Sequence, residues 1–384
     1  MKKIIVLILS ILILLIPTLV LSAPSISSVT GTITDGSTIT VSGTGFTSHG
    51  LDIDFGKDGI EAQSVGPASD FGNWQWEQTS EILTDPNITD SVVHSGTKAI
   101  DSTVIAYENA SIWRWQYSST IGFSTDLYIT WWVRKIRTGS GDGQWKMFRI
   151  MPIDSIVDSS TPQIRWFDWD SYNQFFIAPG PGSSAINSDG SPEDYLSNPW
   201  PENDNNWYRV EIRVTTCSAQ GVSDGSYTVT VLDPVGDTVE SHSNNSAYNT
   251  FNYTGRNYYK WLIWQNFVSN EDSSFTMRVY LDDPYVQVGT VSRIEIGDSN
   301  TYSTCTHREI MEPSAWSTTS ITAKLNTGSL PNGTAYMFVI DENGDASSGY
   351  EVTIGATVST GNTQLGSGTP IDISDPTAPS VVLF

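Results

Sequence analysis

The central part of the sequence is a succession of short segments in which aromatic and β-branched residues are concentrated, and no other feature constrains the fold as strongly. Clusters of Gly, Pro, Asp and Ser, such as residues 139–143 and 178–182, separate these segments. The pattern is typical of strands joined by turns, and no stretch has a convincing helical repeat. We therefore expect an all-β chain whose centre is a two-sheet sandwich. The segments span residues 111–117, 127–134, 144–150, 163–169, 207–214, 226–231, 259–264 and 275–281.

The charge composition supports this expectation. Charged residues make up 16% of the 384 residues, against about 25% in an average protein. The Glu and Lys repeats that build solvent-facing helices are therefore scarce. Asp and Glu number 42 against 19 Lys and Arg, a net charge of −23, so nucleic acid is not an expected partner. The length predicts two domains.

Residues 1–22 have the pattern of a secretory signal peptide. Two lysines form a basic start, residues 4–16 are apolar except for Ser10, and the small residues Ser22 and Ala23 follow. Cleavage after Ser22 would give a secreted or cell-surface protein, and the alternative is an uncleaved membrane anchor. No later segment is apolar for long enough to span a membrane, so we expect no span after cleavage.

The two ends of the mature chain look like parts of one domain. Residues 24–31 and 37–46 alternate as two strands around an Asp-Gly turn, and the second strand ends in ITVSGTGF. These residues resemble the opening strands of IPT/TIG domains, which are small immunoglobulin-like sandwiches. The later strands of such a domain resemble residues 291–297, 314–325, 333–340 and 349–355.

This resemblance implies a split sandwich made of residues 24–48 and 290–355, with residues 51–288 inserted into it. Insertion at a loop tip is physically tolerated, and a hairpin left alone would be only marginally stable. The alternative is an unpaired N-terminal hairpin followed by a separate C-terminal β domain. Only the split sandwich requires residues 38–43 to pair with a strand in 290–355. Residues 356–384 have linker composition and are predicted to be a flexible tail.

Two local patterns in the inserted region point to a narrower class of sandwich. Residues 206–213 (NWYRVEIR) and 279–286 (VYLDDPYV) resemble strands of concanavalin-A-like jelly rolls. That superfamily includes laminin-G-type modules, legume-type lectins, glucanases and polysaccharide lyases. The resemblance implies a jelly-roll fold for residues 51–288, and a fold by itself does not fix an activity.

The scarce basic residues gather in the central strands. Because the rest of the chain is acidic, we expect them to form a local positive groove for carboxylate- or sulfate-bearing glycans. The alternative is that they pair with acids such as Asp168, Asp170 and Glu211 and only neutralise one sheet. Trp113 and Trp115 share a strand face, which either stacks on sugar rings or fills the core. The residues predicted to contact glycan are Arg114, Lys146, Arg149, Arg165, Tyr172, Tyr259 and Lys260.

No catalytic motif is identified. The E-x-D-x-E strand of the related glucanases is absent. A polysaccharide lyase would need a Tyr, His or Lys base, with Arg or Gln neutralising the uronate carboxylate. The predicted glycan-contacting residues could supply these groups, but no spacing assigns them. The four histidines have no partner motif and are interpreted as surface or capped residues.

Two residue pairs leave alternatives open. Asp282 and Asp283 either contribute to a structural Ca²⁺ site, the one cofactor that the sequence suggests, or form an acidic pair at a solvated rim. Cys217 and Cys305 either form a disulfide that links two domains or remain thiols.

The leading hypothesis is a secreted polysaccharide-binding or surface-adhesion protein, whose partner is a polysaccharide or cell-surface glycan. Its motivation is the tryptophan-rich, locally basic strand set together with the missing catalytic motif. One alternative is a lyase that cleaves a uronate polymer by β-elimination. Another is a structural surface or appendage protein that uses its sandwiches for assembly.

Overall fold

A computed structural model describes most of the chain. The predicted signal peptide, Tyr172 and residues 359–384 lie outside the described residues. In several strands, including those of Arg114, Lys146, Arg165 and Lys260, only the backbone position is described. The described ranges are 23–53, 56–70, 74–75, 86–105, 109–138, 144–151, 164–169, 176–177, 205–222, 224–248, 259–269, 276–355 and 357–358.

Nearly all of the regular secondary structure in the described chain is antiparallel β strand, which confirms the predicted all-β class. The exceptions are helix α2 (Gly56–Ala62) and one 3-10 turn (Tyr302–Thr304). The expectation of no helix is wrong for α2, because seven residues are too few to show an amphipathic repeat. Within the described residues, no helix is long and apolar enough to cross a membrane.

The two ends of the chain form one small sandwich, named here the end sandwich (residues 23–48 and 290–358). One sheet has the order β20-β21-β2-β1-β24 and the other the order β19-β18-β22-β23. The strands are β1 (Ser25–Thr32), β2 (Thr38–Thr44), β18 (Arg293–Gly297), β19 (Arg308–Ile310), β20 (Glu312–Trp316), β21 (Ser320–Lys324), β22 (Gly333–Ile340), β23 (Tyr350–Ile354) and β24 (Thr357–Val358).

Pairing between β2 and β21 holds the two ends together. The ladder runs from Thr38 opposite Lys324 to Ser42 opposite Ser320. One core cluster contains residues from both ends, including Val41 from the first and Ile321 from the second. The predicted pairing is therefore present, and the alternative of an unpaired hairpin is wrong. Strand β24 also pairs with β1, so the predicted flexible tail cannot begin before residue 359.

Close backbone packing explains the glycine in the SGTGF stretch. A Cβ at Gly43 would lie 2.0 Å from the carbonyl oxygen of Ser25 and 2.6 Å from the ring of Phe46. Phe46 is fully buried in the core of the end sandwich. Glycine therefore lets β1 and the Phe46 ring approach β2 closely.

The inserted residues form a second, larger sandwich, named here the large sandwich (residues 51–288). Its nine-stranded sheet has the order β15-β14-β13-β9-β17-β7-β6-β4, with β3 also paired to β17. These strands are β3 (Leu51–Ile53), β4 (Gly66–Pro67), β6 (Asn87–Thr89), β7 (Ala99–Ile105), β9 (Asp126–Thr138), β13 (Tyr208–Thr215), β14 (Gly225–Asp233), β15 (Thr238–Tyr248) and β17 (Thr276–Val288).

The opposing sheet of the large sandwich has six strands in the described chain, in the order β12-β11-β10-β16-β8-β5. Between the sheets lies a core cluster that includes Trp131, Phe148, Val210 and Trp264. Alternation along each strand delivers these side chains to one face. The strands are β5 (Trp74–Gln75), β8 (Asn109–Ile121), β10 (Gln144–Met151), β11 (Ile164–Trp169), β12 (Phe176–Ile177) and β16 (Tyr259–Ser269).

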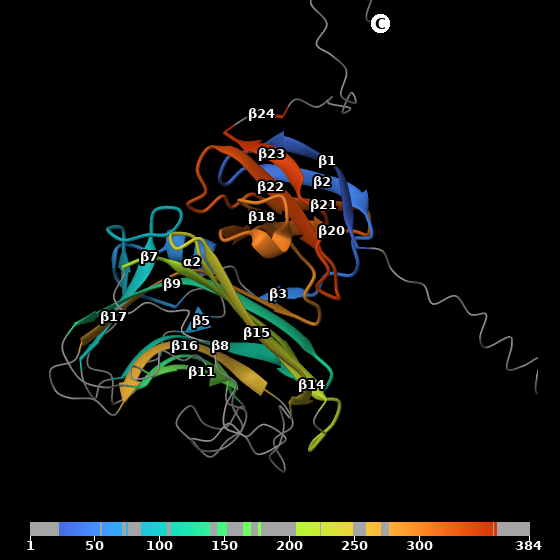
Figure 1. The fold of residues 1–384 in the computed structure, drawn as a ribbon. Helices are drawn as coiled ribbons and strands as arrows, with labels where there is room; N and C mark the ends of the chain where they lie inside the picture. The colour runs from blue at the N-terminus through green and yellow to red at the C-terminus, as the bar shows by residue number, and fades with distance from the viewer. Residues whose placement is uncertain are drawn as a thin grey trace, which may run out of the picture.

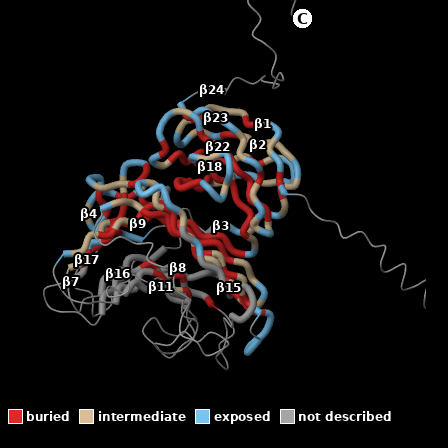
Figure 2. The backbone as a smooth tube through the Cα atoms, viewed as in Figure 1, coloured by how far each residue is buried: buried red, intermediate tan, exposed pale blue. Residues whose placement is uncertain are grey.

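The end sandwich packs on the outer face of the nine-stranded sheet, while the six-stranded sheet covers the inner face (Figure 1). Strand β9 crosses the middle of this arrangement and is buried along most of its length (Figure 2). On one side of β9, Trp131 packs in the core of the large sandwich, and on the other Tyr128 packs with Val291 and Ile310 of the end sandwich. The nine-stranded sheet is therefore a central layer.

Cys217 and Cys305 are buried thiols and form no disulfide. Cys217 belongs to the core of the large sandwich, whereas Cys305 packs against Phe338 and Ile340 of the end sandwich. Burial raises the pKa of the Cys305 thiol to about 12. The disulfide alternative is therefore wrong and the thiol alternative is correct.

Candidate functional site

The outer face of the six-stranded sheet can be identified from the residues that point inward. Phe148 and Ile150 on β10 and Leu262 and Trp264 on β16 are fully buried in the core of the large sandwich. Arg149 lies between two of these residues, so alternation places it on the opposite face, where it is half-buried.

Three arginine positions lie in one row across this outer face. Arg149 on β10 is opposite Arg165 on β11 and, on its other side, opposite Ile263 on β16. Ile263 is in turn opposite Arg114 on β8. Residues directly opposite in a ladder share a face, and strands are about 4.8 Å apart. The row from Arg165 to Arg114 therefore spans three strand intervals, or about 14 Å.

The next row on the same face combines an aromatic and an amide position. Trp261 on β16 is opposite Met151 on β10 and Gln116 on β8. Each lies two residues along its strand from a member of the arginine row, so the two rows are neighbours. The outer face thus combines guanidinium, indole and amide positions, and we name these two rows the arginine face.

The tryptophans of β8 belong to the other face. Trp113 is opposite the buried Trp264, and Trp115 is opposite the buried Leu262. The backbone register therefore places these two positions on the side of the sheet opposite to the arginine face.

Tyr259 does not belong to the arginine face, and its predicted glycan contact is wrong. Its side chain is fully buried in the core of the large sandwich, and burial raises the pKa of its phenol above the ordinary value. The strand register shifts between Tyr259 and Trp261, which turns Tyr259 inward. The same irregularity contains Lys260, so alternation does not assign Lys260 to a face.

Lys146 is opposite Phe167 and Phe267, beyond a bulge that separates it from the arginine row. Tyr172 lies outside the described residues.

The basic residues of the central strands do not all gather on one sheet. Arg134, Lys135 and Arg137 lie on β9 in the nine-stranded sheet, and Lys135 is buried. Arg134 donates to the side-chain oxygen of Asn205, at 3.1 Å from its Nε. The expectation that these basic residues share one sheet is therefore wrong. Strand β9 lies between β8 and β10 in the sequence, but it belongs to the nine-stranded sheet, whereas β8, β10 and β11 belong to the six-stranded sheet.

The junction of the two sandwiches contains a buried network of charged residues that the sequence did not predict. Arg209 of β13 lies 3.1 Å from Glu295 of β18 and 3.1 Å from Glu211 of its own strand. Arg308 of the end sandwich donates to Glu211 at 2.7 Å. Burial would raise the pKa of Glu295, but Arg209, Arg293 and Arg308 outweigh it and lower the pKa to about 2. This network links the sandwiches and leaves Glu211 committed to two arginines.

Asp282 and Asp283 also lie at this junction rather than at a solvated rim. A bulge follows Asp282 in β17, and Asp283 has a φ of 47°. Asp282 accepts hydrogen bonds from the backbone amides of His94 (2.9 Å) and Ser95 (3.2 Å). Burial and the neighbouring Asp283 raise the pKa of Asp282 well above its ordinary value. The solvated-rim interpretation is wrong, and calcium binding stays a prediction.

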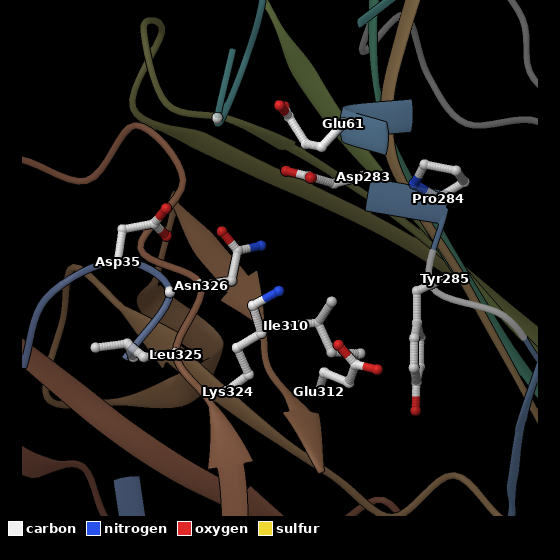
Figure 3. Close-up of a pocket in the computed structure, with 12 residues that line it drawn as sticks. Asp35, Glu61, Asp283, Pro284, Tyr285, Ile310, Glu312, Lys324, Leu325 and Asn326 are labelled. Atoms are coloured by element: carbon white, nitrogen blue, oxygen red, sulfur yellow. The ribbon is translucent and has the colours of Figure 1, made fainter. Parts of the chain in front are cut away.

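A cavity of about 260 Å³ lies between the sandwiches beside Asp283. Figure 3 shows Glu61 and Asp283 on one side and Lys324 and Asn326 of the end sandwich on the other. Asp35 and Glu312 also line it. Four carboxylates against one ammonium disfavour an anionic ligand, so this cavity does not suit the acidic glycan that the sequence suggests.

The histidines are interpreted from the sequence as surface or capped residues, and two of them are not at the surface. His94 and His307 are buried, and both contact Glu309. The nearest sequence signal was the isolated His307-Arg-Glu309 stretch, since His94 lies 215 residues before Glu309.

Comparison with known proteins finds similarity of fold only. No protein-family model matches the sequence. No curated protein matches it either. Among solved structures, an endo-β-1,4-glucuronan lyase from the fungus Trichoderma reesei is 12% identical, with 58% of this chain and 93% of that chain covered and a TM-score of 0.40. Lectin II from Ulex europaeus is 11% identical, with 63% and 100% covered and a TM-score of 0.38. An alginate lyase from Chlorella virus is 12% identical, with 51% and 88% covered and a TM-score of 0.35.

Proposed function

We propose that this is a secreted or cell-surface protein that binds an anionic polysaccharide along the arginine face. The observation that supports the proposal is the row formed by Arg165, Arg149 and Arg114 on the side of the six-stranded sheet turned away from the core. In this proposal the end sandwich, which resembles an IPT/TIG domain, presents the large sandwich, and the leader directs the chain to export.

The chemistry of the row suits carboxylate or sulfate groups spaced along a polymer. Guanidinium groups bind such groups through paired, charge-assisted hydrogen bonds. The adjacent Trp261 position offers an indole to the apolar face of a sugar ring. Neutral glycans would use only the second of these contacts, so the proposal favours an acidic polymer.

Of the acids weighed as partners for these bases, Glu211 and Asp168 lie elsewhere, and Asp170 lies outside the described residues. Glu211 lies in the other sheet and is already paired with Arg209 and Arg308. Asp168 is three residues along β11 from Arg165, so alternation places it on the other face. The direct ladder neighbours within the row are arginine and isoleucine, with Gln75 opposite Arg114 at its end.

A binding panel tests the proposal. The mature protein is titrated with polygalacturonate, alginate and glucuronan, and with a neutral β-glucan of similar length as control. We expect binding to at least one acidic polymer, weaker binding as salt is raised from 50 to 500 mM, and little binding to the neutral polymer. Equal affinity for neutral and acidic polymers, or no binding to any, would refute it.

A lyase is the second candidate, and the Gln116 position favours it. Gln116 lies two residues from Arg114 on the same face, and an amide beside a guanidinium can neutralise a uronate carboxylate during proton abstraction. The same incubations are followed for the ultraviolet absorbance of unsaturated products. A sustained rise would assign the lyase activity, whereas binding without a rise supports a non-catalytic module.

A further inference from the structure

Three potential metal ligands from both sandwiches meet at the junction. His94 comes from the segment between β6 and β7 of the large sandwich, whereas His307 directly precedes β19 of the end sandwich and Glu309 lies within β19. Their nearest ligand atoms all lie within 4.8 Å of one another, and the three residues are buried. Within the described part of the chain, this is the only such group of three His, Cys, Asp or Glu residues.

Both imidazoles point the same nitrogen at the same oxygen. The distance from His94 Nε2 to Glu309 Oε1 is 2.8 Å, and from His307 Nε2 to Glu309 Oε1 it is 2.7 Å. The side-chain exposure is 2% for His94 and 1% for Glu309, while His307 retains 9%. The three groups therefore converge on one shielded point, with His307 nearest to solvent.

Neighbouring groups hold each of the three in place. Trp132 Nε1 donates to Glu309 Oε2 at 3.0 Å, which leaves Oε1 turned toward the histidines. The His94 ring stacks on Trp132, with centroids 3.7 Å apart. The backbone amide of His307 donates to Asp298 at 3.1 Å. Such outer contacts fix ring orientation in known metal sites and reduce the entropy lost on binding.

We propose that His94, His307 and Glu309 form a binding site for a divalent transition metal ion of the Zn²⁺ class. Two imidazole nitrogens and one carboxylate oxygen are ligands that Zn²⁺ prefers, whereas Ca²⁺ and Mg²⁺ prefer oxygen alone. Three protein ligands leave one tetrahedral position for water.

The rearrangement needed for binding is small. Zn–N and Zn–O bonds of about 2.0–2.2 Å at tetrahedral angles separate the ligand atoms by about 3.4 Å. The two Nε2–Oε1 distances of 2.8 and 2.7 Å must open by about 0.6 and 0.7 Å, and the two imidazole ligand atoms, which lie within 4.8 Å of each other, must also come to about 3.4 Å. Binding would require each imidazole to present Nε2 without a hydrogen and to carry its single ring proton on Nδ1, and any further proton on the rings would be released to solvent.

The site would link the two sandwiches. One ligand belongs to the insertion and two to the domain that carries it, so bound metal would restrain their relative position. This role does not depend on the arginine face, which lies on the other sheet of the large sandwich.

The experiment uses the mature full chain, treated with a chelator and then titrated with Zn²⁺ or Co²⁺. We expect about one ion per chain, visible absorption of Co²⁺ in a four-coordinate site, and a Tm that rises by several degrees with Zn²⁺. His94→Gln and His307→Gln should remove both signals, because glutamine can still donate to Glu309 but lacks the imidazole ligand.

His49→Gln is the matched control. His49 also lies at the junction, contacts Asp52 at 2.9 Å and stacks on Trp316, but it meets only one carboxylate. This variant should keep the metal and the Tm gain. If the glutamine variants do not fold, the Co²⁺ spectrum of the unmodified protein decides the matter. The proposal would be overturned, in favour of a hydrogen-bonded cluster only, if Co²⁺ gave no absorption, Zn²⁺ did not change the Tm and less than one ion bound per chain. It would also be overturned if His49→Gln lost metal binding to the same extent as the other two variants.

Discussion

Replacing Glu295 by glutamine tests whether the buried network holds the two sandwiches together. The Glu295 side chain has 0% exposure and lies 3.1 Å from Arg209 and 3.6 Å from Arg308. Its pKa falls from an ordinary 4.5 to about 2 because the arginine charges outweigh the effect of burial. That difference corresponds to about 3 kcal/mol of stabilisation at neutral pH. Removing one partner of a buried pair costs about 3–5 kcal/mol, so we expect a loss in this range for Glu295→Gln.

Urea unfolding at pH 7, followed by tryptophan fluorescence, measures the loss. Glu351→Gln on β23 is the control, because Glu351 is exposed and its replacement should change the free energy of unfolding by less than about 0.5 kcal/mol. A loss below about 1 kcal/mol for Glu295→Gln at an unchanged m-value would refute the reasoning.

The acid dependence gives a second readout of the same residue. Because the folded pKa of Glu295 is lowered, its contribution is present above about pH 4.5 and is lost as the pH falls toward 2. Glu295→Gln should therefore show a shallower loss of stability across this window than the unmodified protein. Identical acid profiles would contradict the assignment.

Two further predictions concern the close packing at Gly43 and the two buried thiols. Gly43→Ala should destabilise the protein by about 1–3 kcal/mol in chemical unfolding, because its Cβ would meet the Ser25 carbonyl. Gly122→Ala, whose Cβ meets nothing within 4 Å, should be near neutral, and equal effects would contradict the packing argument. Cys217 and Cys305 should resist alkylation at pH 8 in the native state and react when unfolded without reductant, as read by mass spectrometry; a mass change on reduction would contradict the thiol assignment.

The strands and the joining of the two ends were predictable because local patterns encode them. Alternation in β2 and the SGTGF stretch already indicated a strand that required a partner, and β21 supplies it. These features depend on neighbours in sequence and on the period of two in a strand.

The junction was not predictable from the alternation of polar and apolar residues. Alternation indicates that the two faces of a strand differ, but it does not indicate whether solvent or another domain covers the polar face. Arg209 and Glu211 alternate with buried apolar residues in β13, a pattern that ordinarily indicates a solvated face. Here the end sandwich covers that face, and charges from distant segments neutralise one another. His94 and Glu309 likewise meet only through the packing of two domains.

Register irregularities account for the remaining differences at the candidate site. Arg114, Arg149 and Arg165 fall in one row because β8, β16, β10 and β11 pair in that order without a break at that level. Tyr259 is turned into the core by the irregularity beside it. A bulge changes the face of every residue beyond it, and the sequence carries no direct signal for its position.

The most direct test of the arginine face is a calorimetric titration of a matched pair of variants with an acidic oligosaccharide that binds the unmodified protein. Arg149→Gln removes the middle member of the row, while Arg278→Gln removes the same charge from an exposed ion pair with Asp101 on the other sheet. A charge-assisted hydrogen bond contributes about 1.5–3 kcal/mol, so Arg149→Gln should weaken binding about 10- to 100-fold and Arg278→Gln less than about 2-fold. Equal affinity of the two variants would contradict the location of the site on the arginine face.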